Sequence, residues 1–266
     1  MLSLLRMDCR RLTHGGEMRT AVLTELLVLL FVCFALSLVA SPQMLSAMAG
    51  QGAEITAGDY AQAEQFQQMT LLELVDDGQF ATMLSAGVMA LFGAAELTSG
   101  FAKNIFAVHA RRGRYVAARC VSCGIAALAV VVLYVAGMLA FGRLFGLPVR
   151  LDAPQDIAQF VFLKWLVCWG FAMLGSFAAL LFRREGVAQL VAVLLGVCLL
   201  QASLDGFWGV FHLPFNLMDV TLYRANSLVP IAFDLPRFVA VAAVSLAWVA
   251  VYALLSLLVL KKRDAA

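Results

Sequence analysis

The sequence predicts an all-α integral membrane protein with six transmembrane helices. Of its 266 residues, 63% are hydrophobic and only 14% are charged, and the mean hydropathy is +0.90. Soluble domains are typically about a quarter charged, so this composition excludes a large soluble domain. Six apolar stretches approach or exceed the length of about 20 residues that a helix needs to cross a bilayer.

Residues 1–20 are expected to form an amphipathic helix that lies in the membrane interface. Arg6 and Arg10 fall on one face of this helix, opposite an apolar stripe. Such a pattern is typical of helices that lie flat on a membrane. Asp8 is the exception, because it falls within the apolar stripe. The stripe itself consists of Met1, Leu5, Cys9 and Leu12.

Residues 21–266 are expected to form a single transmembrane domain. An even number of spans places both termini on the same side of the membrane. Most of the basic residues, 14 of the 19 Lys and Arg, lie in four segments. These segments are the N-terminal segment, the second and fourth connections between spans, and the C-terminal tail. Positive charge is retained on the cytoplasmic face, so both termini are predicted to be cytoplasmic. The six expected spans cover residues 21–40, 80–96, 115–141, 157–182, 187–204 and 238–260.

The two large outer connections differ in character. Residues 41–79 are polar and acidic, and their second half has the pattern of an amphipathic helix on the outer surface. Residues 205–237 are rich in Phe, Leu, Val and Trp. Irregular backbone is not viable where it faces lipid, so this connection is expected to re-enter the membrane as short half-helices before the sixth span. Its expected breaks are at Pro214, Pro230 and Pro236.

The connection between the second and third spans carries a distinctive pattern within residues 96–120. Phe101, Ile105 and Val108 follow the i, i+4, i+7 spacing of one helix face, and Lys103 and Asn104 lie off that face. A short amphipathic helix at the cytoplasmic surface is suited to docking in a groove on a soluble partner. The alternative is a basic loop that obeys the positive-inside rule and contacts anionic lipid.

Seven residues of this stretch form a spaced pattern, namely Glu96, Gly100, Lys103, Asn104, Arg112, Tyr115 and Arg119. This pattern resembles the junction between the second and third spans of type-2 ABC transporter permeases, a family that includes bacteriocin-immunity, peptide-export and drug-export subunits. Arg119 stands where the family more often has Lys. The resemblance implies a coupling helix that rests in a separate ATPase subunit. The partner-binding residues that it implies are Gly100, Phe101, Lys103, Asn104, Ile105, Val108, Arg111 and Arg112.

By this resemblance the chain is the permease subunit of an ATP-driven exporter in the bacterial cytoplasmic membrane. A second copy or a homologous permease would complete the path for a hydrophobic or amphipathic cargo, such as a membrane-active peptide, a bacteriocin or a drug. The sequence contains no G-x4-G-K-S/T phosphate loop, so ATP and Mg are expected on the partner ATPase and this chain is not expected to be an enzyme. No cofactor, metal or nucleic acid is expected on the chain itself, and membrane lipid is an expected contact.

Four residues are candidates for pairing or gating. Glu96 lies at the inner mouth near several arginines, while Asp205, Phe211 and Phe215 belong to the hydrophobic outer connection. Two alternative functions stay open, which are a non-transporting immunity or sensor protein and an ion-coupled secondary transporter.

Two further features bear on these alternatives. Ion-coupled transport is disfavoured because Glu25 and Lys164, the charges inside spans, are expected near the span ends. The small-residue stripe of Ala86, Ala90 and Ala94 permits close helix packing, either within the chain or at a dimer interface.

Overall fold

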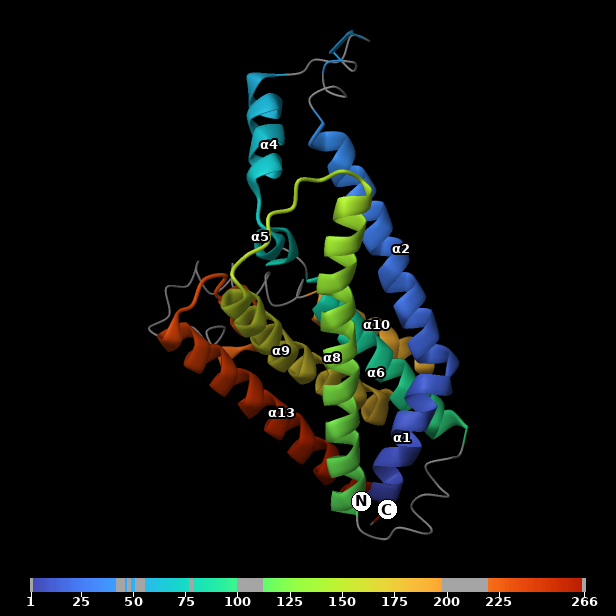
Figure 1. Cartoon of the computed structure of the whole chain (residues 1–266). Helices are drawn as coiled ribbons and strands as arrows, with labels where there is room; N and C mark the ends of the chain where they lie inside the picture. The colour runs from blue at the N-terminus through green and yellow to red at the C-terminus, as the bar shows by residue number, and fades with distance from the viewer. Residues whose placement is uncertain are drawn as a thin grey trace, which may run out of the picture.

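The fold is a bundle of long helices (Figure 1). The computed structural model describes residues 2–41, 46, 49–50, 56–76, 79–99, 112–197 and 220–264. Among these residues, five helices are long and apolar enough to cross a membrane, which fits a multi-pass membrane protein. They are α2 (Gly16–Val39), α6 (Phe80–Thr98), α8 (Arg112–Leu144), α9 (Pro154–Phe182) and α13 (Leu235–Asp264).

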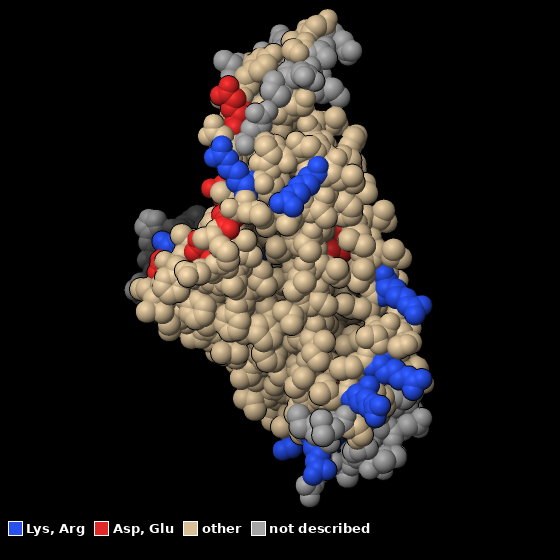
Figure 2. Space-filling model, in the orientation of Figure 1, with Lys and Arg blue, Asp and Glu red and all other residues tan. Residues whose placement is uncertain are grey.

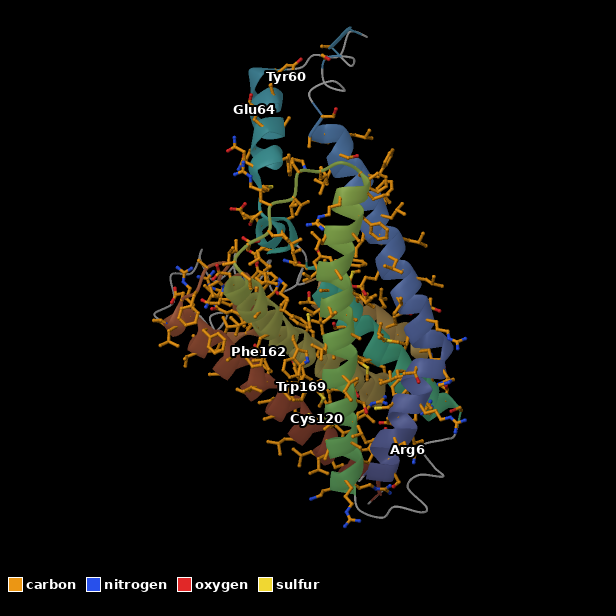
Figure 3. All side chains as sticks on the ribbon, in the orientation of Figure 1. Arg6, Tyr60, Glu64, Cys120, Phe162 and Trp169 are labelled. Atoms are coloured by element: carbon orange, nitrogen blue, oxygen red, sulfur yellow. The ribbon has the colours of Figure 1, made fainter. Side chains whose placement is uncertain are left out.

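Shorter helices accompany the long ones in the described part of the chain. The two chain termini lie at one end, and α4 extends from the opposite end (Figure 1). Figure 3 shows the same separation, with Arg6 of α1 at one end and Tyr60 and Glu64 of α4 at the other. These shorter helices are α1 (Leu2–His14), α4 (Ala57–Gln68), α5 (Leu71–Asp76), α10 (Glu185–Gly196) and α12 (Leu222–Ser227).

Five of the six expected spans coincide with long helices. The first begins earlier than expected, because only Gly15 has an extended backbone (φ −68°, ψ 151°) and Gly16 already belongs to α2. The fifth expected span, residues 187–204, is described only as far as Val197, and the 12 residues of α10 are too few to cross a bilayer alone. A sixth transmembrane helix therefore stays a prediction. The re-entrant path also stays a prediction, because residues 205–219 lie outside the described residues.

Helices α6 and α9 form the centre of the bundle. In each, 72% of the most apolar 18-residue window is buried inside the chain, compared with 17% in α2 and α13. Apolar side chains such as Leu27, Phe31 and Leu254 are exposed on those outer helices. Such a surface is suited to lipid, because hydrocarbon does not penalise exposed apolar groups.

The main chains of α6 and α9 approach each other closely. A Cβ atom added at Gly175 of α9 would overlap the carbonyl oxygen of Ala86 in α6. Ala86, Ala90 and Ala94 are fully buried within the chain. Small residues permit this proximity, as in other membrane helix pairs. The alanine stripe therefore packs inside this chain and does not form a dimer interface.

Two tryptophans fix α9 against α8. The indole nitrogens of Trp165 and Trp169 donate hydrogen bonds of 2.8 Å to the carbonyl oxygens of Gly124 and Cys120, respectively. The two indole rings stack with centroids 5.5 Å apart. Figure 3 shows Trp169 and Cys120 on these neighbouring helices. Each buried indole N–H thus has a partner, as amphipathic aromatic residues require.

The expected outer amphipathic helix is two helices, α4 and α5, which are separated at Thr70. Thr70 and Glu73 form a capping box, in which the Thr70 N–H donates to Glu73 Oε2 (2.8 Å) and the Glu73 N–H donates to Thr70 Oγ1 (3.4 Å). The connection after α8 also holds this turn, since the Leu71 N–H donates to the Arg150 carbonyl oxygen. The capping box starts a new helix at a point where the sequence pattern alone suggests one continuous helix.

The described part of the hydrophobic outer connection packs on the bundle. Trp248 of α13 donates a 2.6 Å hydrogen bond from Nε1 to the carbonyl oxygen of Val220. Leu222 of α12 lies against Gly170 of α9, where a larger residue would collide with it. Residues 220–229 are therefore anchored to α9 and α13.

Charges separate along the bundle. Figure 2 shows Lys and Arg gathered over the end that carries both termini, while Asp and Glu lie toward the opposite end with a few basic side chains among them. Exposed Arg6 and Lys262 belong to the first end, and exposed Glu64 and Glu73 to the second. This distribution follows the positive-inside pattern.

Candidate functional site

A buried ion pair joins the end of α6 to the beginning of α8. Glu96 lies in the last turn of α6 and is 0% exposed. Arg119 of α8, which is 4% exposed, donates a hydrogen bond of 3.1 Å from Nη1 to Glu96 Oε2. The same carboxylate oxygen lies 3.4 Å from Nη1 of Arg11 in α1. One acid thus links three helices.

An aromatic ring lies beneath both arginines. Phe92 precedes Glu96 by one helical turn, so the two side chains share a face of α6. The guanidinium carbons of Arg119 and Arg11 lie 4.4 Å and 4.9 Å from the centroid of the Phe92 ring. These are cation–π contacts, which are strongest where the cation is desolvated. The buried Phe92 ring therefore helps to stabilise the positive charge of both arginines.

A second acid completes the cluster. Asp8 of α1 is 3% exposed, and its Oδ2 accepts a hydrogen bond of 3.1 Å from Ser122 Oγ of α8. Burial raises the pKa of Asp8, while the positive charge of Arg119 opposes this rise and the negative charge of Glu96 adds to it. The buried stripe of α1 is Leu4, Asp8 and Leu12. The acid that interrupts the apolar pattern in the sequence therefore lies at the centre of the packed face.

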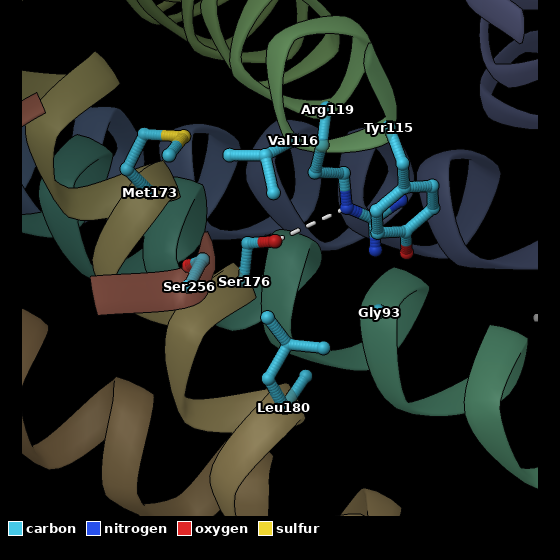
Figure 4. A pocket seen from close by; sticks show the side chains of 9 residues that line it. Gly93, Tyr115, Val116, Arg119, Met173, Ser176, Leu180 and Ser256 are labelled. Atoms are coloured by element: carbon cyan, nitrogen blue, oxygen red, sulfur yellow. Dashed lines mark hydrogen bonds between the residues drawn. The ribbon is translucent and has the colours of Figure 1, made fainter. Parts of the chain in front are cut away.

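Arg119 also contacts α9 beside a small cavity. Its Nε donates a hydrogen bond of 3.1 Å to Ser176 Oγ (Figure 4). The adjoining cavity, of about 10 Å³, is close to the minimum space that one water molecule needs. Gly93, Tyr115 and Ser256 are among its lining residues, so α6, α8, α9 and α13 all reach it. A side chain at position 93 would displace the guanidinium, because an added Cβ would lie 2.8 Å from Arg119 Nη2.

The buried charge cluster, by which we mean Asp8, Arg11, Glu96 and Arg119, contains two acids and two bases. Buried opposite charges hold their helices together, because separation would leave each charge unpaired. Among the described residues, no group of three or more His, Cys, Asp or Glu side chains could hold a metal ion. The ion pairs of Glu96 with Arg11 and Arg119 make the cluster suited to linking α1, α6 and α8 mechanically.

The predicted site residues fall into two groups. Glu96 lies in the buried charge cluster, and Arg112, which is half-buried, opens α8. The remaining predicted residues lie outside the described residues, namely Gly100, Phe101, Lys103, Asn104, Ile105, Val108 and Arg111 of the coupling segment, and Asp205, Phe211 and Phe215 of the outer connection.

Several members of the site were not identified from the sequence. Asp8, Arg11, Phe92, Ser122 and Ser176 were not among the predicted site residues, although each contacts another member of the site. One signal was available, since an acid within the apolar stripe of an amphipathic helix needs a buried partner.

Comparisons with protein-family models, with curated proteins and with solved structures give no match. The geometry of the buried charge cluster and the sequence pattern around it are therefore the basis for assigning a function. They share Glu96 and Arg119, which lie at the two ends of the connection between α6 and α8.

Proposed function

We propose that the chain is the membrane-spanning permease subunit of an ATP-driven ABC exporter. One observation carries the proposal: Glu96 and Arg119, the first and last residues of the pattern that resembles the permease family, form a buried ion pair. The connection between α6 and α8 therefore has its two ends tied together inside the bundle. A partner that pushes on residues 100–111 would move α6 and α8 as one unit.

The proposed mechanism uses this linkage for coupling. Closure of two ATPase subunits on ATP would displace the connections, and the ion pairs of Glu96 would pass the displacement to α1 through Arg11. ATP then favours one conformation because the complex binds nucleotide more tightly in that conformation. ATP and Mg would be held by the ATPase, and a second permease copy or a homologue would complete the path.

The proposed cargo is hydrophobic or amphipathic, such as a membrane-active peptide, a bacteriocin or a drug. The outer helices expose apolar side chains such as Leu27 and Leu254. A cargo that partitions into lipid can approach such a surface, whereas a highly charged one is excluded by hydrocarbon. The proposed location is the bacterial cytoplasmic membrane.

Purification under gentle conditions tests the proposal against its alternatives. We expect an ABC ATPase to co-purify with the full chain from its native membrane. A non-transporting immunity or sensor protein, or an ion-coupled transporter, would purify without one. Reproducible absence of any ATPase, from membranes in which transport of the cargo was first measured, would rule out the exporter.

Sidedness is a separate prediction. Single cysteines at Lys262 and Ala61, both exposed, should differ in their reaction with a membrane-impermeant maleimide in intact cells. The cysteine at Ala61 should react and the one at Lys262 should react only after permeabilisation, because the basic end of the bundle is expected to be cytoplasmic. The endogenous cysteines must first be replaced. The opposite labelling pattern would invert the assigned orientation.

The coupling segment gives the next prediction. Replacing Phe101 and Ile105 together with Asp should abolish transport and cargo-stimulated ATP hydrolysis while the subunit stays inserted, because the apolar face no longer fits a groove on the ATPase. Ala107→Asp adds one Asp away from that face, in place of the two on it, and serves as the control for an acidic residue in this segment. Transport that survives the double substitution would instead support a lipid-contacting loop.

A further inference from the structure

Glu25 is an acid buried in the middle of an apolar helix. It lies in α2, seven residues beyond Met18, where the candidate span begins. Most of α2 is exposed, yet the Glu25 side chain is only 1% exposed. Leu29, one turn further on, packs against Gly137 of α8. Glu25 therefore lies on the face of α2 that points into the bundle.

The carboxyl group of Glu25 has no polar partner in the part of the chain that the structure describes. Neither Oε1 nor Oε2 makes a hydrogen bond, and no Lys, Arg or His nitrogen lies within 4.0 Å of either oxygen. Glu96 is equally buried but has two arginines at its carboxylate. Positive charges therefore neutralise the carboxylate of Glu96, whereas none in the described part of the chain is close enough to neutralise that of Glu25.

Two further polar side chains of the buried interior, Lys164 and Cys168, belong to α9. Glu25 and Lys164 both lie close enough to the Cys168 thiol to influence it. Lys164 is 1% exposed and Cys168 is 0% exposed. The acid, the base and the thiol are therefore all enclosed within the bundle. Lys164 is not within ion-pairing distance of Glu25 in this arrangement.

We propose that Glu25 is a proton-binding site and that it carries a proton in this conformation. An ionised carboxylate without a partner in hydrocarbon is strongly unfavourable, and protonation removes that charge. Binding of a proton neutralises the carboxylate without requiring a second polar side chain beside it. Loss of the proton would require water or a cation to enter between α2 and its neighbours, so the position of α2 is linked to pH. This inference does not depend on the proposed transport activity.

Infrared spectroscopy of the full chain in lipid nanodiscs at neutral pH tests the proposal. The wild-type spectrum should contain the C=O stretching band of a protonated carboxylic acid. Glu25→Gln should lose this band while its elution volume and melting temperature stay unchanged, because the amide has nearly the same shape and no charge. Glu64→Gln, an exposed acid on α4, is the control and should leave the band intact.

Two results with Glu25→Gln would overturn the proposal. The first is a wild-type spectrum with no band that Glu25→Gln removes. The second is a marked drop in melting temperature for Glu25→Gln, since that variant would be destabilised only if the native carboxylate were charged and paired. Glu25→Asp gives an independent readout, because it should shift the band to a new frequency without abolishing it. An unshifted band in Glu25→Asp would also contradict the assignment.

Discussion

Glu96→Gln should destabilise the protein by about 3–5 kcal/mol, because it leaves buried Arg119 without its acid. This is one of the two largest effects that we expect. For a chain of this size the loss corresponds to a drop in melting temperature of roughly 10 °C. The measurement is thermal unfolding of the purified subunit, followed by circular dichroism. If the chain is the permease proposed above, transport coupling should also fall, since the ion pair that ties α6 to α8 would be lost.

A double-mutant cycle separates the ion pair from general damage. Glu96→Gln combined with Arg119→Gln should be less destabilising than the sum of the two single substitutions, because the pair is removed together. Arg11→Gln is the graded control, since its side chain is 27% exposed and water can replace part of its contact with Glu96. Additive effects of the first two substitutions would show that the two residues are energetically independent.

Gly175→Ala should prevent normal assembly of the bundle. The new methyl group would overlap the carbonyl oxygen of Ala86. A main-chain atom in a helix cannot rotate away as a side chain can, so α6 and α9 would have to separate along their contact. We expect loss of the folded, monodisperse species on size-exclusion chromatography and increased sensitivity to protease.

Two variants make the Gly175 result specific. Gly186→Ala is the matched control, because a Cβ there meets nothing within 4 Å and alanine favours a helix over glycine by about 1 kcal/mol. It should leave the protein equally or more stable. Ala86→Gly should fail to rescue Gly175→Ala, since the obstacle is the carbonyl oxygen and not the alanine methyl. Rescue by Ala86→Gly would show that the side chains determine the spacing of these helices.

Hydropathy was sufficient to predict five long helices, because a membrane span must be apolar along its whole length whatever it packs against. Their relative burial was not predictable in this way. Helix α9 contains Lys164 and yet lies at the centre, whereas α2 is more apolar and lies outside. Whether a helix is buried within the bundle depends on small residues such as Gly175, which allow close packing. Hydropathy does not measure this property.

The candidate site was predictable only where local spacing determined it. Glu96 and Arg119 belong to one stretch of sequence, so their pattern was visible before their contact. Asp8 and Ser176 reach the site from distant parts of the chain. Only the packing of α1 brings Asp8 to Ser122, and only the packing of α9 brings Ser176 to Arg119. Glu25 was expected near the end of its span, but the break at Gly15 starts α2 earlier and leaves this acid deeper within the helix.

The contact between the ends of the chain has a consequence for biosynthesis. Leu4 of α1 packs in the same apolar cluster as Leu260 of α13, together with Tyr115 and Leu180. A ribosome makes α1 long before α13, at about 5–20 residues per second. The basic end of the bundle must therefore remain open while the intervening helices enter the membrane. Until the last helix has arrived, Leu4 and its neighbours present an apolar surface that lipid or a chaperone has to cover.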